Sequence, residues 1–218
     1  MNMVSNHNSK KKKAVALSAA GVVLVAGATV TSLAAWTDTE WIWGGGEGAT
    51  GVGTSAFNVQ QNVTTGDAAG SWVDAETSPG QQINFGVDAN SLTPGDTVYA
   101  FVRLQTESDS DAGELSLNAA VAGGTTGQTL FAALNYEARI LASAADCNSA
   151  DFAGTGTTLV PAGSPLTTAG STEFALAGNA AQEQTVCFAL TLPAAEASNQ
   201  SLQGLTATPI WNFTAISQ

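Results

Sequence analysis

Near the middle of the chain the sequence reads Thr97-Val98-Tyr99-Ala100-Phe101-Val102-Arg103-Leu104. Successive side chains of an extended strand point to opposite faces of a sheet, so the even-numbered residues of this stretch, which are all apolar, share one face. Tyr99 and Phe101 occupy the other face. Because both faces carry large apolar groups, the pattern predicts a strand that is central in its sheet or covered on both sides.

Other runs of alternating or β-branched residues lie on both sides of this stretch, separated by Gly, Pro, Asn and Asp. In the clearest of them we expect Leu115, Leu117, Ala119 and Val121 to face inward and Ala120 to face outward. The pattern predicts eight strands in all. They cover residues 54–63, 81–87, 97–104, 113–121, 135–142, 171–176, 183–192 and 205–216.

Helical periodicity is confined to residues 128–134, which can form only a turn or two. Turn residues punctuate the chain elsewhere, and we interpret Pro94-Gly95-Asp96 as a structural turn. The sequence therefore predicts an all-β domain, an antiparallel β-sandwich of about eight strands with one short helix.

The first 34 residues have the three-part layout of a secretory signal peptide. Lysines occupy positions 10–13, an uncharged apolar run follows, and Ser32-Leu33-Ala34 offers small side chains to a signal peptidase. We therefore predict cleavage between Ala34 and Ala35, and an extracellular protein. The alternative is an uncleaved membrane anchor, because about 20 apolar residues can span a bilayer. In both cases everything after Trp36 lies outside the cell.

Residues 35–53 separate the signal peptide from the domain at residues 54–218. This segment begins with Trp36, Trp41, Ile42 and Trp43 and continues with six glycines between positions 44 and 53, which make a flexible tether. Large aromatic groups are usually buried. The Trp-rich arm therefore either folds back as an edge strand of its own domain or adds as a donor strand to another copy.

Charge excludes two classes of partner. Once the lysines at 10–13 are removed, Arg103 and Arg139 oppose 18 carboxylates, a net charge of −16. Such a chain repels nucleic acid and anionic lipid. The cleavage point has no cysteine to carry a lipid and the C-terminal residues contain no sorting motif, so we expect no stable membrane anchor after processing.

Cys147 and Cys187 are the two cysteines of the chain, and in an oxidising compartment they predict one disulfide. Two unpaired buried thiols are the alternative. The partner of Cys187 should approach from the loop at 146–149, because Cys187 lies opposite the alternating apolar face of its strand. The single histidine, His7, lies in the signal peptide, so no imidazole remains to activate a nucleophile or complete a zinc site. We expect no enzyme activity, no metal and no cofactor.

Two further features allow a functional and a structural interpretation. The acidic residues at 107–114 could supply oxygen ligands to calcium, but they lack the spacing of an EF-hand loop and are better explained as a solvated turn. Trp72 is a candidate sugar contact, whereas Trp211 is expected in the core. A secreted carbohydrate-binding or adhesive module is therefore an alternative function.

Four short motifs occur in order along the chain. They are Ala34-Ala35-Trp36-Thr37-Asp38, Thr54-Ser55-Ala56-Phe57-Asn58-Val59, Leu92-Thr93-Pro94-Gly95-Asp96, and Gly204-Leu205-Thr206-Ala207-Thr208-Pro209-Ile210-Trp211-Asn212. Together they resemble the TasA and camelysin family, whose members are exported and processed by the signal peptidase SipW.

The resemblance implies a jelly-roll β-sandwich and, as in TasA, extracellular biofilm-matrix fibres built by passing an N-terminal strand into the next subunit. Its implied partners are a SipW-type signal peptidase and further copies of the chain, joined head to tail. Camelysin-like proteins are described as metallopeptidases, but no His-Glu-x-x-His motif is present here. The chain also departs from the family in being shorter, in having no lysine after Lys13, and in its cysteine pair and Gly-rich tether.

Export should remove residues 1–34, because small side chains occupy the cleavage positions and the junction resembles that of the family. N-terminal sequencing of the secreted protein is expected to begin at Ala35-Trp36. Recovery of only the full-length chain, and only from membranes, would contradict both the cleavage and the resemblance.

Overall fold

The computed structural model describes residues 42, 44, 54–150, 152 and 154–218, and in this part of the chain eleven strands and one α-helix form. One sheet contains β1 (Val59–Asn62), β2 (Val73–Asp74), β3 (Thr97–Thr106), β6 (Asn135–Leu141), β7 (Thr157–Pro165) and β9 (Gln184–Thr191). The second contains β4 (Gly113–Leu117), β8 (Phe174–Leu176) and β11 (Phe213–Ser217). A small ribbon pairs β5 (Val121–Ala122) with β10 (Pro209–Ile210), and α1 is Gln128–Ala133. Short 3-10 turns occupy Val87–Asn90, Ala144–Asp146, Ala194–Ser198 and Gln200–Leu202.

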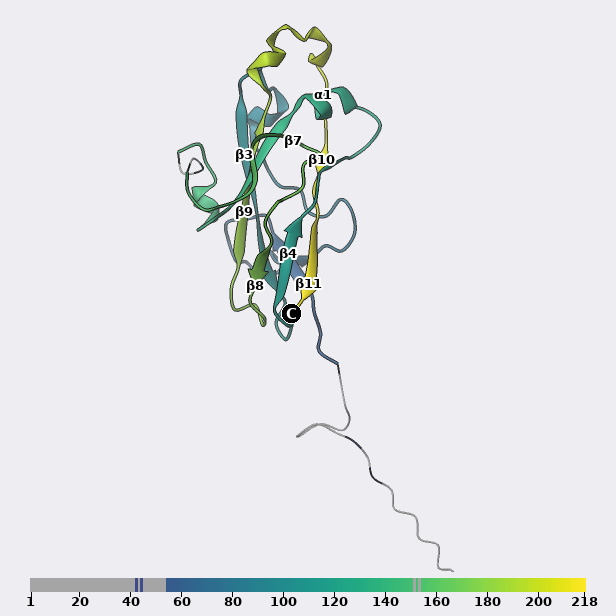
Figure 1. The fold of residues 1–218 in the computed structure, drawn as a ribbon, viewed down its shortest axis with the longest axis vertical. Helices are drawn as coiled ribbons and strands as arrows, with labels where there is room; N and C mark the ends of the chain where they lie inside the picture. Colours follow the sequence, from purple (N-terminus) through teal and green to yellow (C-terminus); the bar gives the residue numbers. More distant parts are fainter. Residues whose placement is uncertain (1–41, 43, 45–53, 151, 153) are drawn as a thin grey trace, which may run out of the picture.

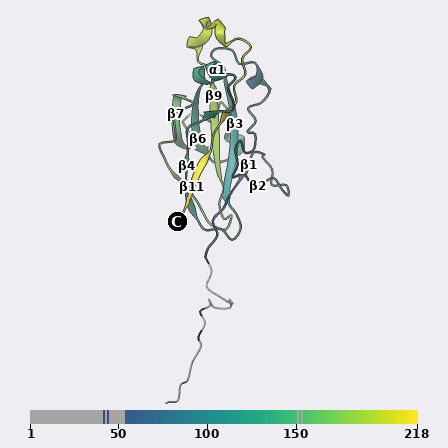
Figure 2. The ribbon, with the colours of Figure 1, turned by 90° about the vertical axis from the view of Figure 1, so that its right-hand side faces the viewer.

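The strands stack as a two-layer sandwich in which all ladders between named strands are antiparallel. The larger sheet has the order β2-β1-β3-β9-β6-β7 and the smaller one the order β11-β4-β8. In Figure 1, β3 and β9 lie to the left of β4 and β11, and in Figure 2 the smaller sheet is turned toward the viewer. The predicted all-β sandwich with one short helix is confirmed.

The central strand β3 pairs with β1 on one side and with β9 on the other, as its sequence predicts. Its even-numbered residues from 98 to 104 are at most 7% exposed, and Val98, Val102 and Leu104 belong to the main core between the sheets. The facing residues of β9 are equally buried, with Val186 and Phe188 at 0% and 1% exposure. Leu115 and Leu117 of β4 complete the layer from the other side.

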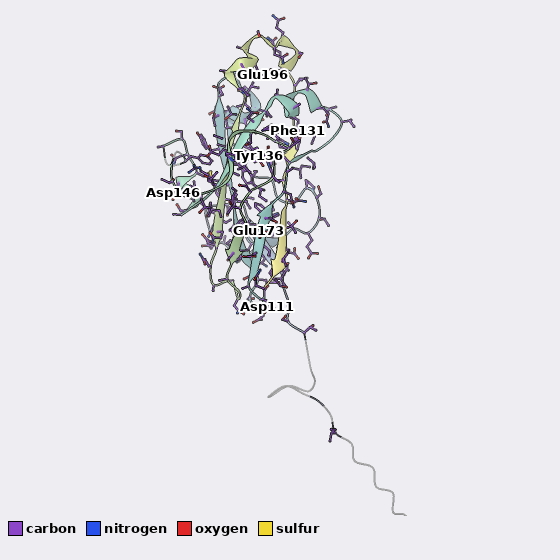
Figure 3. The ribbon with its side chains drawn as sticks, viewed as in Figure 1. Asp111, Phe131, Tyr136, Asp146, Glu173 and Glu196 are labelled. Carbon is purple, nitrogen blue, oxygen red and sulfur yellow. A yellow bond between two sulfur atoms is a disulfide. The ribbon has the colours of Figure 1, made fainter. Side chains whose placement is uncertain are left out.

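The outer face of the larger sheet has a small apolar cluster of its own. Cys187 and Ala189 of β9 pack there against Leu141 and Phe152, and Tyr99 of β3 joins them. A disulfide joins Cys187 to Cys147, whose Cα atoms lie 5.6 Å apart, so the predicted pair and its approach from the loop after β6 are confirmed. Figure 3 places Asp146 of this loop on the side of the larger sheet away from β4 and β11.

Trp211 lies between β10 and β11 and packs into the core, as predicted. Its ring centroid is 5.0 Å from that of Phe188 and 5.7 Å from that of Tyr136. The Tyr136 hydroxyl donates to the Thr168 carbonyl. Burial raises the pKa of Tyr136 to about 12, against a smaller lowering contribution from Trp211, so this hydroxyl stays protonated at physiological pH.

The motif at 93–96 forms the predicted turn before β3. The Asp96 carboxylate accepts the Thr93 backbone N–H at 2.7 Å and the Thr93 hydroxyl at 2.8 Å, and these bonds lower the pKa of Asp96. Gly95 has φ 103°, a left-handed conformation that glycine adopts without strain. The turn is therefore structural, as expected.

Two expectations about individual strands are wrong. Residues 81–87 form no strand: Ile83 and Phe85 pack on the core, but the Asn84 side chain accepts the Gly86 N–H at 2.8 Å and turns the chain. Conversely, β7 forms where no strand was expected, although Pro161 interrupts its sequence. This strand lies at the edge of its sheet, where proline is tolerated because the missing N–H has no ladder partner to lose.

The alternation predicted for residues 113–121 holds only as far as Leu117, where β4 ends. Ala120 is buried at 3% exposure and Val121 is 60% exposed, the reverse of what was expected. The phase changes because the chain leaves β4 and starts a new ladder, in which Val121 pairs with Ile210.

In the described part of the chain no helix is long and apolar enough to cross a membrane.

Replacing both cysteines, as in Cys147→Ser with Cys187→Ser, should lower the free energy of unfolding by about 2 to 4 kcal/mol. The disulfide restricts the unfolded chain across 40 positions and ties the loop after β6 to the sheet. Urea titration of the wild type and the double variant measures the difference. Two freely alkylated thiols in the native wild-type protein would contradict the pairing.

Candidate functional site

Most of the residues proposed to act in export and assembly lie outside the described part of the chain. These are the cleavage positions Ala34 and Ala35 and the aromatic residues Trp36, Trp41 and Trp43. Ile42 is described and is 96% exposed. The structure instead describes the point at which residues 54–58 enter the domain and the sheet edges that a donor strand could reach.

Residues 54–58 are held against the turn between β3 and β4, a contact that we call the N-terminal anchor. Ala56 forms an isolated parallel bridge with Ser110, and the Asp111 N–H donates to the Ala56 carbonyl at 3.0 Å. Ser110 is buried, at 3% exposure. Its hydroxyl accepts a hydrogen bond from the Asn58 N–H at 2.9 Å and donates one to the Asn58 carbonyl at 3.2 Å. One buried serine therefore supplies the acceptor for the Asn58 N–H and a donor to the Asn58 carbonyl.

Phe57 completes the anchor by packing on a glycine. A Cβ atom added at Gly113 would lie 2.5 Å from two ring carbons of Phe57 and 2.8 Å from the Ile216 carbonyl oxygen. Only glycine leaves room for this close approach. The entering chain therefore lies beside the last residues of β11. Asp111, in the same turn, lies at the end of the sandwich that carries the C-terminus (Figure 3).

The acidic residues between 107 and 111 belong to the turn that forms this anchor, and Glu114 lies in β4. Asp109 adopts φ 68°. The Ser110 N–H donates to the Glu107 carbonyl at 3.2 Å, and the Glu107 N–H donates to the Asn58 carbonyl at 3.0 Å. Among the described residues no group of three or more His, Cys, Asp or Glu side chains could hold a metal ion. Residues 107–112 form the turn between β3 and β4.

Trp72, the candidate sugar contact, lies under the guanidinium group of Arg103. The Arg103 Cζ atom is 5.0 Å from the centroid of the indole ring, a cation–π geometry. Arg103 also donates to Glu183 through Nε at 3.2 Å and pairs with Asp67 through Nη2 at 2.8 Å. Burial lowers the pKa of Arg103, but its bonds to Glu183 and Asp67 outweigh burial and raise the pKa above its ordinary value.

The loop between β1 and Trp72 folds around the same arginine. Arg103 donates through Nη1 to the carbonyls of Thr64 and Gly66, and the fully buried Asn62 accepts the Thr64 N–H at 2.8 Å and donates to Gly66 at 3.0 Å. Trp72 is half-buried in this arrangement. The structure thus gives Trp72 a part in holding the loop, and its role as a sugar contact stays a prediction.

The sheet edges differ in how well they are protected against added strands. Within the described chain, β2, β7, β8 and β11 each pair with one neighbour. The β7 edge carries Pro161 and Pro165, and its ladder with β6 has register shifts. Both the prolines and the irregular ladder discourage the pairing of another strand. The edges β2 and β8 have only two and three residues. The edge β11 has five residues, Phe-Thr-Ala-Ile-Ser, without proline or charge, and exposes Ile216 at 62%.

The hydrogen bonds at both ends of β11 show which of its amides face outward. The Asn118 N–H donates to the Asn212 carbonyl at 3.0 Å, and the Gln218 N–H donates to the Ala112 carbonyl at 2.9 Å. In an antiparallel ladder hydrogen-bonded and non-hydrogen-bonded pairs alternate. The even-numbered residues of β11 therefore bond to β4, and the backbone groups of Phe213, Ala215 and Ser217 point away from it.

Sequence reasoning did not identify Ser110 or Gly113. Ser110 makes its contacts with a residue 52 positions away, and Gly113 is needed because of Phe57. Neither residue belongs to a motif with a recognisable spacing, so only the folded chain shows their role.

No model of a known protein family matches the chain, and no curated protein matches it.

The substitution Ser110→Ala should lower the free energy of unfolding by about 1 to 3 kcal/mol, because it leaves the part-buried Asn58 N–H without its partner. Urea denaturation measures the change. Ser108→Ala is the matched control, since Ser108 is an exposed residue of the same turn and its loss should stay within about 0.5 kcal/mol. Equal effects of the two substitutions would contradict the role given to the anchor.

Proposed function

We propose that the protein is a secreted structural subunit that assembles head to tail into extracellular filaments, with the N-terminal arm of one copy added as a donor strand to the β11 edge of the next. The observation that carries the proposal is the unprotected β11 edge, which exposes backbone groups and Ile216 while the other edges are short or carry proline. An edge of this kind is a ready template for pairing with another chain. The predicted signal peptide and the resemblance to the TasA and camelysin family support it.

The geometry of the N-terminal anchor supports the same mode of assembly. Because Phe57 packs beside Gly113 and the Ile216 carbonyl, residues 54–57 lie at the end of the sandwich where β11 ends. The glycines at 44–53 give the arm reach, and strand addition supplies main-chain hydrogen bonds while alternate side chains fix the register. In an extended arm Trp41 and Trp43 share one face, so they would be its anchors. A contact between an arm and a different surface of the next copy does not close on itself and generates filaments.

Electrostatics sets a condition on this assembly. Copies processed after Ala34 each carry a net charge of −16 and repel one another. Salt screens that repulsion, so filaments should form faster as ionic strength rises.

The variant Ala215→Pro tests the acceptor edge. Proline removes the outward-facing N–H of Ala215, which an added strand would use, while the bonds between β11 and β4 involve the even-numbered residues. We expect a folded monomer that forms no filaments in electron micrographs. The matched control Ala215→Val keeps the N–H and should assemble. Filaments of unchanged appearance from a folded Ala215→Pro protein would rule out β11 as the acceptor.

Deleting residues 35–43 tests the donor strand independently of the edge. The truncated protein should retain its β-rich circular dichroism, because both sheets and the core lie within residues 54–218, and it should remain monomeric because it lacks the donor strand. If the truncated protein still forms the same filaments, or if the intact processed protein stays monomeric at high concentration over days, the proposal fails.

A further inference from the structure

The outer face of the larger sheet contains a hollow with a volume of about 270 Å³. Strands β3, β6 and β9 form its base, Ala162 and Gly163 of β7 line one side, and Ser149 and Phe152 of the disulfide-bonded loop line the other. The small side chains on β7 leave the space open. The volume lies just below the range of about 300 to 1,000 Å³ that is typical of pockets for drug-sized ligands, so the hollow suits a smaller molecule.

The hollow has an apolar base. The rings of Tyr99 and Phe152 meet edge to face with centroids 5.5 Å apart, and Ala189, which is 5% exposed, lies beside them. The loop that carries Phe152 is tied to the sheet by the disulfide between Cys147 and Cys187. The base is therefore formed before any ligand arrives, which lowers the ordering cost of binding.

Polar groups surround this base. The hydroxyls of Thr97 and Thr191 lie 2.8 Å apart and share one hydrogen bond, which uses only one of their two hydroxyl hydrogens. Glu137 lines the hollow as well, and its carboxylate accepts a hydrogen bond from the Arg139 Nε at 2.6 Å. A carboxylate held by one bond to a guanidinium still has lone pairs for further donors.

The charge that Glu137 brings to the hollow is balanced by Arg139 beside it. The side chains of Glu137 and Arg139 are only 17% and 16% exposed, and they neutralise each other. Burial, with a smaller contribution from the Glu137 charge, raises the pKa of Tyr99, so its hydroxyl remains a neutral donor and acceptor. The hollow is thus locally neutral in a strongly acidic protein.

We propose that this hollow binds one residue of a neutral saccharide. A pyranose ring has an apolar C–H face and a rim of hydroxyl groups, which match the aromatic base and the polar surround of the hollow. The hydroxyls of the sugar would donate to Glu137 and exchange hydrogen bonds with Thr97 and Thr191. Acidic polysaccharides are excluded, because the net charge of −16 after processing repels them. This site does not depend on filament assembly, and it is distinct from Trp72.

The test is titration of the processed protein, residues 35–218, with neutral hexasaccharides of glucose and mannose, followed by calorimetry and by NMR. A hexamer of galacturonic acid serves as the acidic comparison. We expect at least one neutral hexamer to bind and the acidic hexamer not to bind. Absence of binding by every neutral hexamer at millimolar concentration would overturn the proposal.

The variant Ala162→Phe locates the site, because its ring would fill the hollow from an exposed position on β7. Binding should be lost. The matched control is Ala175→Phe, the same substitution at an exposed position of β8 on the other sheet, and it should bind like the wild type. Glu137→Gln, which keeps the size of the side chain, should raise Kd about tenfold or more by removing a charged acceptor.

Thermal melts show whether each variant is folded, and the Glu137→Gln variant keeps the test decisive if Ala162→Phe fails to fold. Wild-type affinity in a folded Ala162→Phe protein would overturn the assignment. So would loss of binding in Trp72→Ala with normal binding in Glu137→Gln, because the sugar would then occupy the neighbourhood of Trp72.

Discussion

The register between β3 and β9 is the constraint on which the rest of the molecule depends. Eight residues of each strand face one another, from Thr97 opposite Thr191 to Leu104 opposite Gln184. Because side chains alternate, this one alignment sends Val186 and Phe188 into the core and Cys187 to the outer face. A shift by a single residue would bury polar groups and place the cysteine between the sheets. The core, the disulfide and the hollow on the outer face all follow from it.

How much of this could be predicted depended on whether the information was local. The period-two alternation of β3 and β9 is visible in the sequence. The sandwich, the central position of β3 and the cysteine pair could therefore be predicted. The strand β7 was missed because Pro161 is a strand breaker in general and is accepted here only at a sheet edge. Residues 81–87 have the alternation of a strand. However, the Asn84 side chain accepts the Gly86 N–H, and this local hydrogen bond turns the chain instead.

The candidate sites were harder to predict from the sequence, because their residues are far apart in the chain. The N-terminal anchor joins residues far apart in the chain, and the hollow brings together Thr97, Glu137, Phe152 and Thr191 from four separate segments. No spacing in the sequence predicts which hydroxyls will meet across a sheet. Sequence reasoning named Trp72 as a sugar contact, and the structure adds that Arg103 lies over its ring. The hollow lies elsewhere, among residues that no sequence pattern brought together.

The placement of the two arginines has a consequence for resistance to proteolysis. Proteases of the trypsin type cut after lysine or arginine, and residues 54–218 offer them only Arg103 and Arg139. Both lie within strands whose backbones are paired on both sides, β3 between β1 and β9, and β6 between β9 and β7. A protease must bind its substrate in an extended, unpaired form. The folded domain therefore offers this class of enzyme no peptide bond to cut.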